Sequence, residues 1–228
     1  MDGSSQSSGL PGSLEQRLVN EAYVEKYLTS EAHWHRSHAA SQGFLGGGML
    51  YYGFAYALRA RMCVCLGSGG GFVPRVLRQA QRDMGLSRSH TILVDANLRD
   101  AGWGKPKWLP KGSMLRKEFP EILIVLNTTD AAFHKFFVPR GIKIDYLHID
   151  ADHSYEACLA DFDNYSSIMA KSFVISIHDT DMPTVARVVE DLRKRDGLEL
   201  IDLPDLGRGV AFVRPRLPAN QEKLYFVK

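Results

Sequence analysis

The sequence predicts a doubly wound α/β domain, and three of its features lead to this prediction. From Ala60 onward, short apolar runs alternate with segments whose apolar residues have helical spacing. The apolar runs are nearly continuous, as expected for strands of a parallel sheet that is covered on both faces. The last two runs flank a PDLGRG turn, which is typical of an antiparallel hairpin. A length of 228 residues, 45% of them hydrophobic and 24% charged, suits one such domain.

Composition also excludes several classes of protein. No run approaches 18 apolar residues, and the first thirteen residues are polar, so we expect neither a membrane span nor a secretory signal. The formal charge of +2 is too small to indicate a nucleic-acid partner. The three cysteines are Cys63, Cys65 and Cys158. So few cysteines, odd in number, favour reduced thiols and a cytoplasmic location.

Three regions are predicted along the chain: a disordered tail over 1–13, an N-terminal helical segment over 14–60 and the α/β domain over 61–228. In the helical segment, LEQRLVNEAYVEKYL and MLYYGFAYALRA have helical spacing, and we expect the segment to form a lid, a substrate contact or a dimer contact. Between the two helices lie His33, His35 and His38. With no accompanying Cys pair or HExxH, they are not expected to form a zinc site.

Seven strands are predicted in the α/β domain. Five of them form the parallel part of the sheet: MCVCLG, TILVD, ILIVLN, IDYLHID and FVISIHD. The helices between them are predicted in VPRVLRQAQRDMG, AAFHKFFVPRG, SYEACLADFDNYSSIMA and TVARVVEDLRKRDG. The two hairpin strands in LELIDLPDLGRGVAFVRPR close one edge of the sheet. In such a fold, ligands bind at the carboxyl ends of the strands.

A glycine-rich turn follows the first predicted strand and precedes a helix. Its backbone N–H groups can approach a ligand closely, and its residues are Gly67, Ser68, Gly69 and Gly71. The second strand ends in Asp95, whose carboxylate can accept hydrogen bonds from both hydroxyls of a ribose. A purely structural turn and a helix-capping Asp95 are the alternatives. Together the two features favour an adenosine-type ligand.

These residues resemble class I S-adenosylmethionine-dependent methyltransferases, from about Met62 to Pro215. LGSGGG is similar to the first motif of that family, ILVD to the second, and the terminal hairpin to its reversed last strand. The resemblance implies a Rossmann-like sheet of seven strands, mostly parallel, with S-adenosylmethionine as cofactor. The cofactor-binding residues that it implies are Gly67, Ser68, Gly69, Gly71, Asp95, Thr128, Thr129 and Asp150. Cys65 stands where many members have an acidic residue.

The fourth and fifth strands carry more specific signals. IDYLHIDADHSYE and VISIHDT resemble the I-D-x-D-H-S-Y and H-D-T signatures of small-molecule methyltransferases, including the metal-assisted branch that methylates sugar and macrolide hydroxyls. Neighbouring strands lie about 4.8 Å apart, so Asp150 and Asp179 are expected to reach one divalent cation, Mg²⁺ or another, with His178 as a further ligand. The cation would acidify a substrate hydroxyl. Asp152 or His153 would then accept its proton.

Structural roles compete with these interpretations. Asp150 and Asp152 could cap the helix that starts near Ser154, and Asp179 or Thr180 could cap the helix that follows the fifth strand. His148 lies inside a predicted strand and is expected to be a packed core residue.

The functional prediction is therefore a methyltransferase that acts on a small molecule, at a hydroxyl oxygen. One alternative is an NAD(P)-dependent oxidoreductase on the same sheet, against which Phe72 argues because it replaces a glycine of the dinucleotide fingerprint. The other is a non-catalytic cofactor-binding module. We expect a small-molecule substrate and a homodimer, with no nucleic acid and no membrane as partners.

Overall fold

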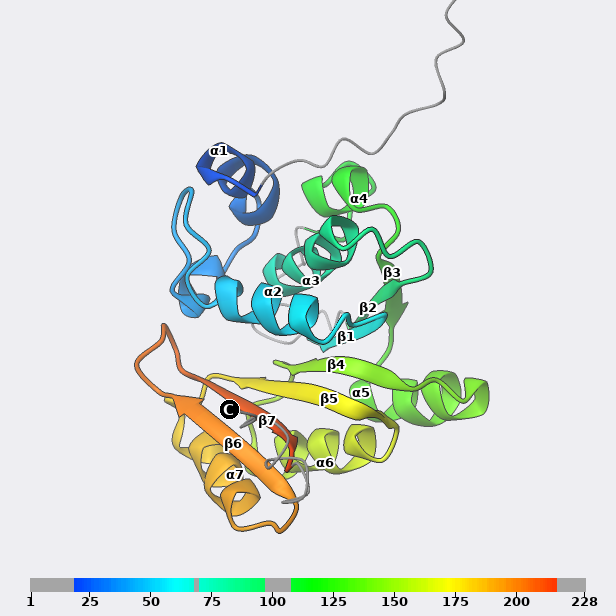
Figure 1. The fold of residues 1–228 in the computed structure, drawn as a ribbon, viewed down its shortest axis with the longest axis vertical. Coiled ribbons are helices and arrows are strands. Elements are labelled where there is room, and N and C mark those ends of the chain that lie inside the picture. Colours follow the sequence, from blue (N-terminus) through cyan, green and yellow to red (C-terminus); the bar gives the residue numbers. More distant parts are fainter. Residues whose placement is uncertain (1–18, 68–69, 97–107, 217–228) are drawn as a thin grey trace, which may run out of the picture.

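The computed structural model describes residues 19–67, 70–96 and 108–216. A sheet of seven strands lies between two layers of helices (Figure 1). The strand order is β3-β2-β1-β4-β5-β7-β6. The first five strands pair in parallel, while β7 runs antiparallel to both β5 and β6. This topology confirms the predicted doubly wound sheet with an antiparallel hairpin at its edge.

The strands follow the predicted apolar runs closely. Their bounds are Met62–Leu66 (β1), His90–Asp95 (β2), Leu123–Leu126 (β3), Ile144–Ile149 (β4), Met169–His178 (β5), Leu198–Leu203 (β6) and Val210–Pro215 (β7). The start of β5 differs from the prediction, since Met169 pairs with Ile144 after a register shift. The preceding helix therefore ends at Ser166 and not near residue 170.

The helices divide between the two faces of the sheet (Figure 1). The N-terminal helices and those next to β1 cover one face: Glu21–Tyr23 (α1), the π-helix Val24–Thr29, the 3-10 turn His35–His38, Gly48–Ala57 (α2), Phe72–Asp83 (α3) and Met114–Glu118 (α4). The other face is covered by Thr129–Ala132 (α5), the π-helix Phe133–Phe137, the 3-10 turn Val138–Arg140, Tyr155–Ser166 (α6) and Pro183–Arg193 (α7). Of the regions predicted at the N-terminus, the tail 1–13 and the first helical residues, 14–18, lie outside the described residues. Among the described helices, none has both the length and the apolar character needed to span a membrane.

Each face of the sheet has its own apolar core. Along β1, Cys63 and Cys65 pack with α2 and α3, whereas Val64 and Leu66 pack with the residues of α6 and α7. Successive side chains of a strand point to opposite faces. A strand that is buried on both faces therefore needs apolar residues at every position, which explains the continuous run MCVCL.

The N-terminal segment crosses the carboxyl edge of the sheet. The Ser37 carbonyl accepts a hydrogen bond from the backbone N–H of Arg208, in the β6–β7 turn, over 2.7 Å. A Cβ on Gly70 would lie 1.7 Å from the His33 carbonyl oxygen, so only glycine lets the segment pack this closely on the turn after β1. The N-terminal segment thus places the region around His33–His38 over the carboxyl edge of the sheet, where ligands of such folds bind.

Candidate active site

The glycine turn joins β1 to α3 in a conformation that few other residues adopt. Gly67 has φ +70°, and its N–H donates to the Val94 carbonyl over 2.8 Å. Gly71 has φ +75° and is the N-cap of α3, and as a glycine it has no side chain with which to cap that helix. A helix start without a side-chain cap offers its backbone N–H groups to a ligand. Ser68 and Gly69, which we also predict in this site, lie outside the described residues.

Asp95 lies next to this turn because β2 pairs with β1. It is the last residue of β2 and is half-buried. The start of α5 lies at the same edge, since the N–H of Asn127 donates to the Asp95 carbonyl over 3.1 Å. Thr128 caps α5 by accepting a hydrogen bond from Ala131 N–H at 3.2 Å. The glycine turn, Asp95 and Thr128 therefore share one edge of the sheet.

Two aspartates and two histidines meet where β4 and β5 end. The Nε2 atom of His153 lies 2.9 Å from Asp179 Oδ2 and 3.5 Å from Asp150 Oδ1. The Nδ1 atom of His178 lies 3.1 Å from Asp179 Oδ2 and 3.4 Å from Asp150 Oδ1. The side chains of the two aspartates are only 12% and 13% exposed. We call these four residues, Asp150, His153, His178 and Asp179, the His/Asp cluster.

The alternative that Asp150 and Asp179 cap the helices that follow them is wrong. Ser154 caps α6, with its hydroxyl accepting from Ala157 N–H. The N-cap of α7 is Met182, whose side chain makes no cap, and the Thr180 hydroxyl donates to Asp202 instead. Asp150 and Asp179 are therefore free of a capping role.

Asp152, the other predicted base, has a different environment from His153. Its Oδ1 accepts from the Ser154 N–H at 2.8 Å, just before α6, and its side chain is exposed. That backbone hydrogen bond lowers the pKa of Asp152. An exposed carboxylate with a lowered pKa is a weak base. His153, and not Asp152, lies between the two carboxylates of the cluster.

The backbone at Asp179 is unusual. Its φ is +59°, in the left-handed region that residues other than glycine rarely adopt. Such a conformation costs about 1–3 kcal/mol and persists only where surrounding contacts hold it. Here His153, His178 and the Arg208 guanidinium, whose Nε lies 3.7 Å from Asp179 Oδ1, supply those contacts.

The cluster shifts the pKa of each of its members. Burial opposes the ionisation of Asp150, but the neighbouring histidines, His178 first, hold its pKa well below the usual range. Burial likewise opposes ionisation of Asp179, yet His153 and His178 lower its pKa to about 2. Contacts with Asp150 and then Asp179 raise the pKa of His153 to about 10. Burial disfavours the charged form of His178, but the Asp150 carboxylate outweighs it and raises that pKa to about 10.

These shifts predict how the stability of the metal-free protein depends on pH. A histidine with a pKa raised from 6.5 to about 10 binds a proton more tightly in the folded state. Its contribution is therefore complete below pH 6.5 and is lost as the pH rises toward 10. In the presence of a chelator, we expect Tm to fall more steeply over this range in the wild type than in His153→Gln. Parallel curves would show that His153 is not stabilised as the imidazolium.

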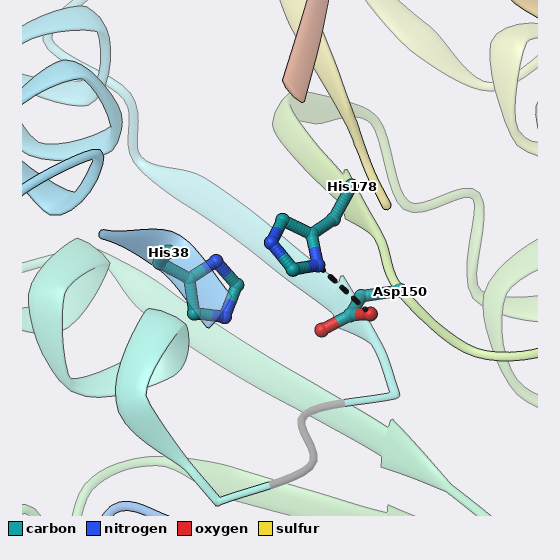
Figure 2. Close-up of side chains that lie close together, drawn as sticks. All are labelled: His38, Asp150 and His178. Atoms are coloured by element: carbon teal, nitrogen blue, oxygen red, sulfur yellow. Dashed lines mark ion pairs between the residues drawn. The ribbon is translucent and has the colours of Figure 1, made fainter. Parts of the chain in front are cut away.

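His38 lies beside the cluster and was missed by the prediction. It is 4% exposed, its ring lies 3.9 Å from the His178 ring at an interplanar angle of 32°, and its Nδ1 lies 3.1 Å from the Tyr51 hydroxyl. Figure 2 shows its ring turned toward His178 and Asp150. Burial and His178 lower its pKa well below the usual range. The three-histidine pattern was the signal in the sequence, but only the fold shows that His38 alone is buried against β5.

His148 is packed in the core, as expected, and also borders the cluster. It is fully buried, and its Nδ1 lies 2.8 Å from the Ser176 hydroxyl. Its Nε2 lies 3.8 Å from Asp150 Oδ2 and makes no hydrogen bond within the described part of the chain. Buried imidazole nitrogens therefore approach the Asp150 carboxylate from more than one side.

The match to known families decides the classification. Residues 64–180, slightly more than half of the chain, match a family described as a methyltransferase domain. The chain belongs to this methyltransferase family. The matched range of the methyltransferase domain contains the glycine turn, Asp95 and the His/Asp cluster, whereas His38 lies before it. This result confirms the predicted family and gives no support to an NAD(P)-dependent oxidoreductase.

Solved structures with a similar fold include three methyltransferases. One is the O-methyltransferase TomG from Streptomyces achromogenes, which is involved in tomaymycin synthesis and was solved with S-adenosylmethionine. It is 16% identical to this chain with a TM-score of 0.63, and the match covers 89% of this chain and 99% of TomG. An O-methyltransferase from Bacillus cereus, solved with S-adenosylhomocysteine, is 14% identical with a TM-score of 0.60, over 86% and 91%. The S-adenosylhomocysteine-bound methyltransferase PaMTH1 from Podospora anserina is 13% identical with a TM-score of 0.59, over 92% and 100%. A comparison with curated protein sequences finds no match.

Proposed function

We propose that this methyltransferase transfers a methyl group from S-adenosylmethionine to a hydroxyl oxygen of a small molecule. The observation that carries the proposal is the meeting, at one edge of the sheet, of a glycine turn, an acidic strand end and the His/Asp cluster. The similar fold of TomG and of the Bacillus cereus enzyme, both named O-methyltransferases, supports an oxygen acceptor.

The residues at β1 and β2 fit the cofactor. Gly67 and Gly71 hold the turn in left-handed conformations, and the N-cap of α3, Gly71, has no side chain that could compete with a ligand. Asp95, at the neighbouring strand end, is placed to accept hydrogen bonds from ribose hydroxyls. Ser68, Gly69, Thr128, Thr129 and Asp150 complete the proposed cofactor site. When bound, S-adenosylmethionine supplies the methyl group from its sulfonium centre.

His153 is the residue we propose to accept the proton of the acceptor hydroxyl. Its side chain is 23% exposed, so a substrate can reach it, and Asp150 and Asp179 fix its orientation. General-base catalysis of this kind contributes about 10²–10⁴-fold. Positioning of the acceptor for in-line attack would contribute a further part of the rate enhancement.

The proposal includes a divalent cation at the same edge. Asp150, His178 and Asp179 would hold it, and two carboxylates that converge on the same imidazole nitrogen fit a cation for electrostatic reasons. The cation would acidify a bound hydroxyl and would offset the negative charge that keeps His153 protonated.

Asp95 provides a test of cofactor placement. Asp95→Ala should weaken binding of S-adenosylhomocysteine by about 1.5–3 kcal/mol, because charge-assisted hydrogen bonds to the ribose are lost. This corresponds to a loss of affinity of about 10-fold to 150-fold. Calorimetric titration measures it, with the exposed Asp196→Ala as the control variant. An unchanged affinity in Asp95→Ala would remove Asp95 from the cofactor site.

The activity itself is tested by incubating the protein with S-adenosylmethionine and a set of hydroxylated small molecules, with matched amines as comparison. We expect release of S-adenosylhomocysteine that depends on a hydroxyl compound. Transfer to amines alone would contradict the oxygen acceptor. Cofactor binding without turnover on any compound would support the non-catalytic module instead.

Three further predictions belong to this proposal. The N-terminal segment, 14–60, serves as a lid or substrate contact for the α/β domain, 61–228, since His33 and Ser37 pack on its ligand-binding edge. The protein is cytoplasmic, where its free and buried thiols, Cys63, Cys65 and Cys158, stay reduced. It forms a homodimer, which light scattering can test.

A further inference from the structure

The donor atoms around Asp150 are not those that Mg²⁺ prefers. Mg²⁺ is bound in proteins by oxygen atoms, with water completing the octahedron. Here buried imidazole nitrogens approach the carboxylate from two histidines, His148 and His178, which are 0% and 2% exposed. Neither of these nitrogens makes a hydrogen bond within the described residues.

The hydrogen bonds of His178 determine which of its nitrogens is available. Its Nε2 lies 3.2 Å from the Ser37 carbonyl, which can only accept, so Nε2 carries a proton. Its Nδ1 faces two carboxylates, Asp150 at 3.4 Å and Asp179 at 3.1 Å. A lone pair in that position would be repelled by both carboxylates. A transition metal bound between Nδ1 and the carboxylates would use that lone pair and remove the repulsion.

His38 supplies a second nitrogen from a different part of the chain. One donor atom each of His38, Asp150 and His178 lie within 4.8 Å of one another. Donor atoms bound at about 2.0–2.2 Å to one tetrahedral metal lie about 3.3–3.6 Å apart, so the donor atoms need to move at most about 1.5 Å closer to one another to close the site. The Nδ1 atom of His38 contacts the Tyr51 hydroxyl, which leaves Nε2 as the donor to a metal. The contact also orients the ring, as outer hydrogen bonds do in metal sites.

We propose that His38, His178 and Asp150 bind a first-row transition metal through two imidazole nitrogens and one carboxylate oxygen (Figure 2). Imidazole donors select metals such as Zn²⁺, Fe²⁺ or Co²⁺ over Mg²⁺. The inference rests on the proposed function for the role of the metal near the acceptor; it places His38, in place of Asp179, as the third ligand, and it names a metal class. Because His38 belongs to the N-terminal segment, metal binding would also fasten this segment to the ends of β4 and β5.

Cobalt titration tests the site directly. Chelator-treated protein is titrated with Co²⁺ and followed by visible absorption, which reports nitrogen and oxygen ligation, and by calorimetry. We expect about one Co²⁺ per chain, resistant to a large excess of Mg²⁺. His38→Gln should bind Co²⁺ at least about tenfold more weakly, whereas His33→Gln, which removes an exposed histidine of the same segment, should bind it like the wild type.

Three results would overturn the inference: no Co²⁺ binding, displacement of Co²⁺ by comparable Mg²⁺, or equal affinity in His38→Gln and the wild type. If His38→Gln does not fold, X-ray absorption of the wild-type cobalt protein counts the imidazole ligands, and fewer than two contradict the site. Titration of the same samples with S-adenosylhomocysteine separates this inference from the proposed function. Cofactor binding without Co²⁺ binding refutes only the metal site, and Co²⁺ binding without cofactor binding refutes only the proposed methyltransferase activity.

Discussion

His153→Gln is expected to lower kcat by about 10²–10⁴-fold, because the variant loses the base that takes the acceptor proton. Glutamine keeps an N–H donor that can face Asp150 and Asp179, but it cannot accept a proton at neutral pH. The affinity for S-adenosylhomocysteine should stay within about twofold of the wild type, since His153 is not in the proposed cofactor site. Steady-state kinetics with an acceptor found in the hydroxyl screen gives kcat, and calorimetry gives the affinity.

Asp152→Asn is the matched comparison, one residue away. Its carboxylate accepts a hydrogen bond from the Ser154 N–H and makes no hydrogen bond or ion pair with the His/Asp cluster among the described residues, and asparagine keeps an oxygen that can accept that hydrogen bond. We therefore expect kcat in Asp152→Asn to stay close to the wild-type value. A larger loss in Asp152→Asn than in His153→Gln would reverse the assignment of the base.

Gly67→Ala is expected to cause a large loss of stability. Its φ of +70° costs an L-residue about 1–3 kcal/mol. The added Cβ would also lie 2.0 Å from the backbone oxygen of Asp150, which cannot rotate away as a flexible side chain can. Forcing extra atoms into a packed site costs about 1–3 kcal/mol more. Urea unfolding measures the change in free energy of unfolding.

Gly85→Ala separates the two causes. Gly85 has φ +63°, similar to that of Gly67, but a Cβ there would meet nothing within 4 Å. The difference in stability between the two variants therefore reports the contact with the backbone of Asp150 and Ala151. Because that contact displaces Asp150, Gly67→Ala should also weaken Co²⁺ binding. Equal destabilisation in both variants would contradict the close approach of β1 to β4.

The sheet could be predicted from the sequence because each buried strand has a continuous apolar run. The side chains of MCVCL pack into both apolar cores, so the run is apolar at every position and predicts β1. The hairpin of β6 and β7 followed from its PDLGRG turn. The early start of β5 could not be predicted, because Met169 joins the strand by pairing with Ile144, a contact between distant residues.

The site was predictable to the extent that it lies at strand ends. Asp150, His178 and Asp179 each end or follow a strand, and neighbouring parallel strands bring them together. His38 lies 140 residues before His178, in a segment without strand or motif signals, so only tertiary packing places it on β5. The choice between Asp152 and His153 likewise depends on which side chain turns toward Asp179, and residue spacing does not determine that direction.

Calorimetric titration of the purified protein with S-adenosylhomocysteine tests directly whether the glycine turn and Asp95 bind this cofactor. We expect binding with a Kd in about the micromolar range, at a stoichiometry of about one per chain. It also predicts that Asp95→Ala weakens this binding. The absence of binding by folded wild-type protein, with and without a divalent cation, would contradict the proposal that the glycine turn and Asp95 hold this cofactor.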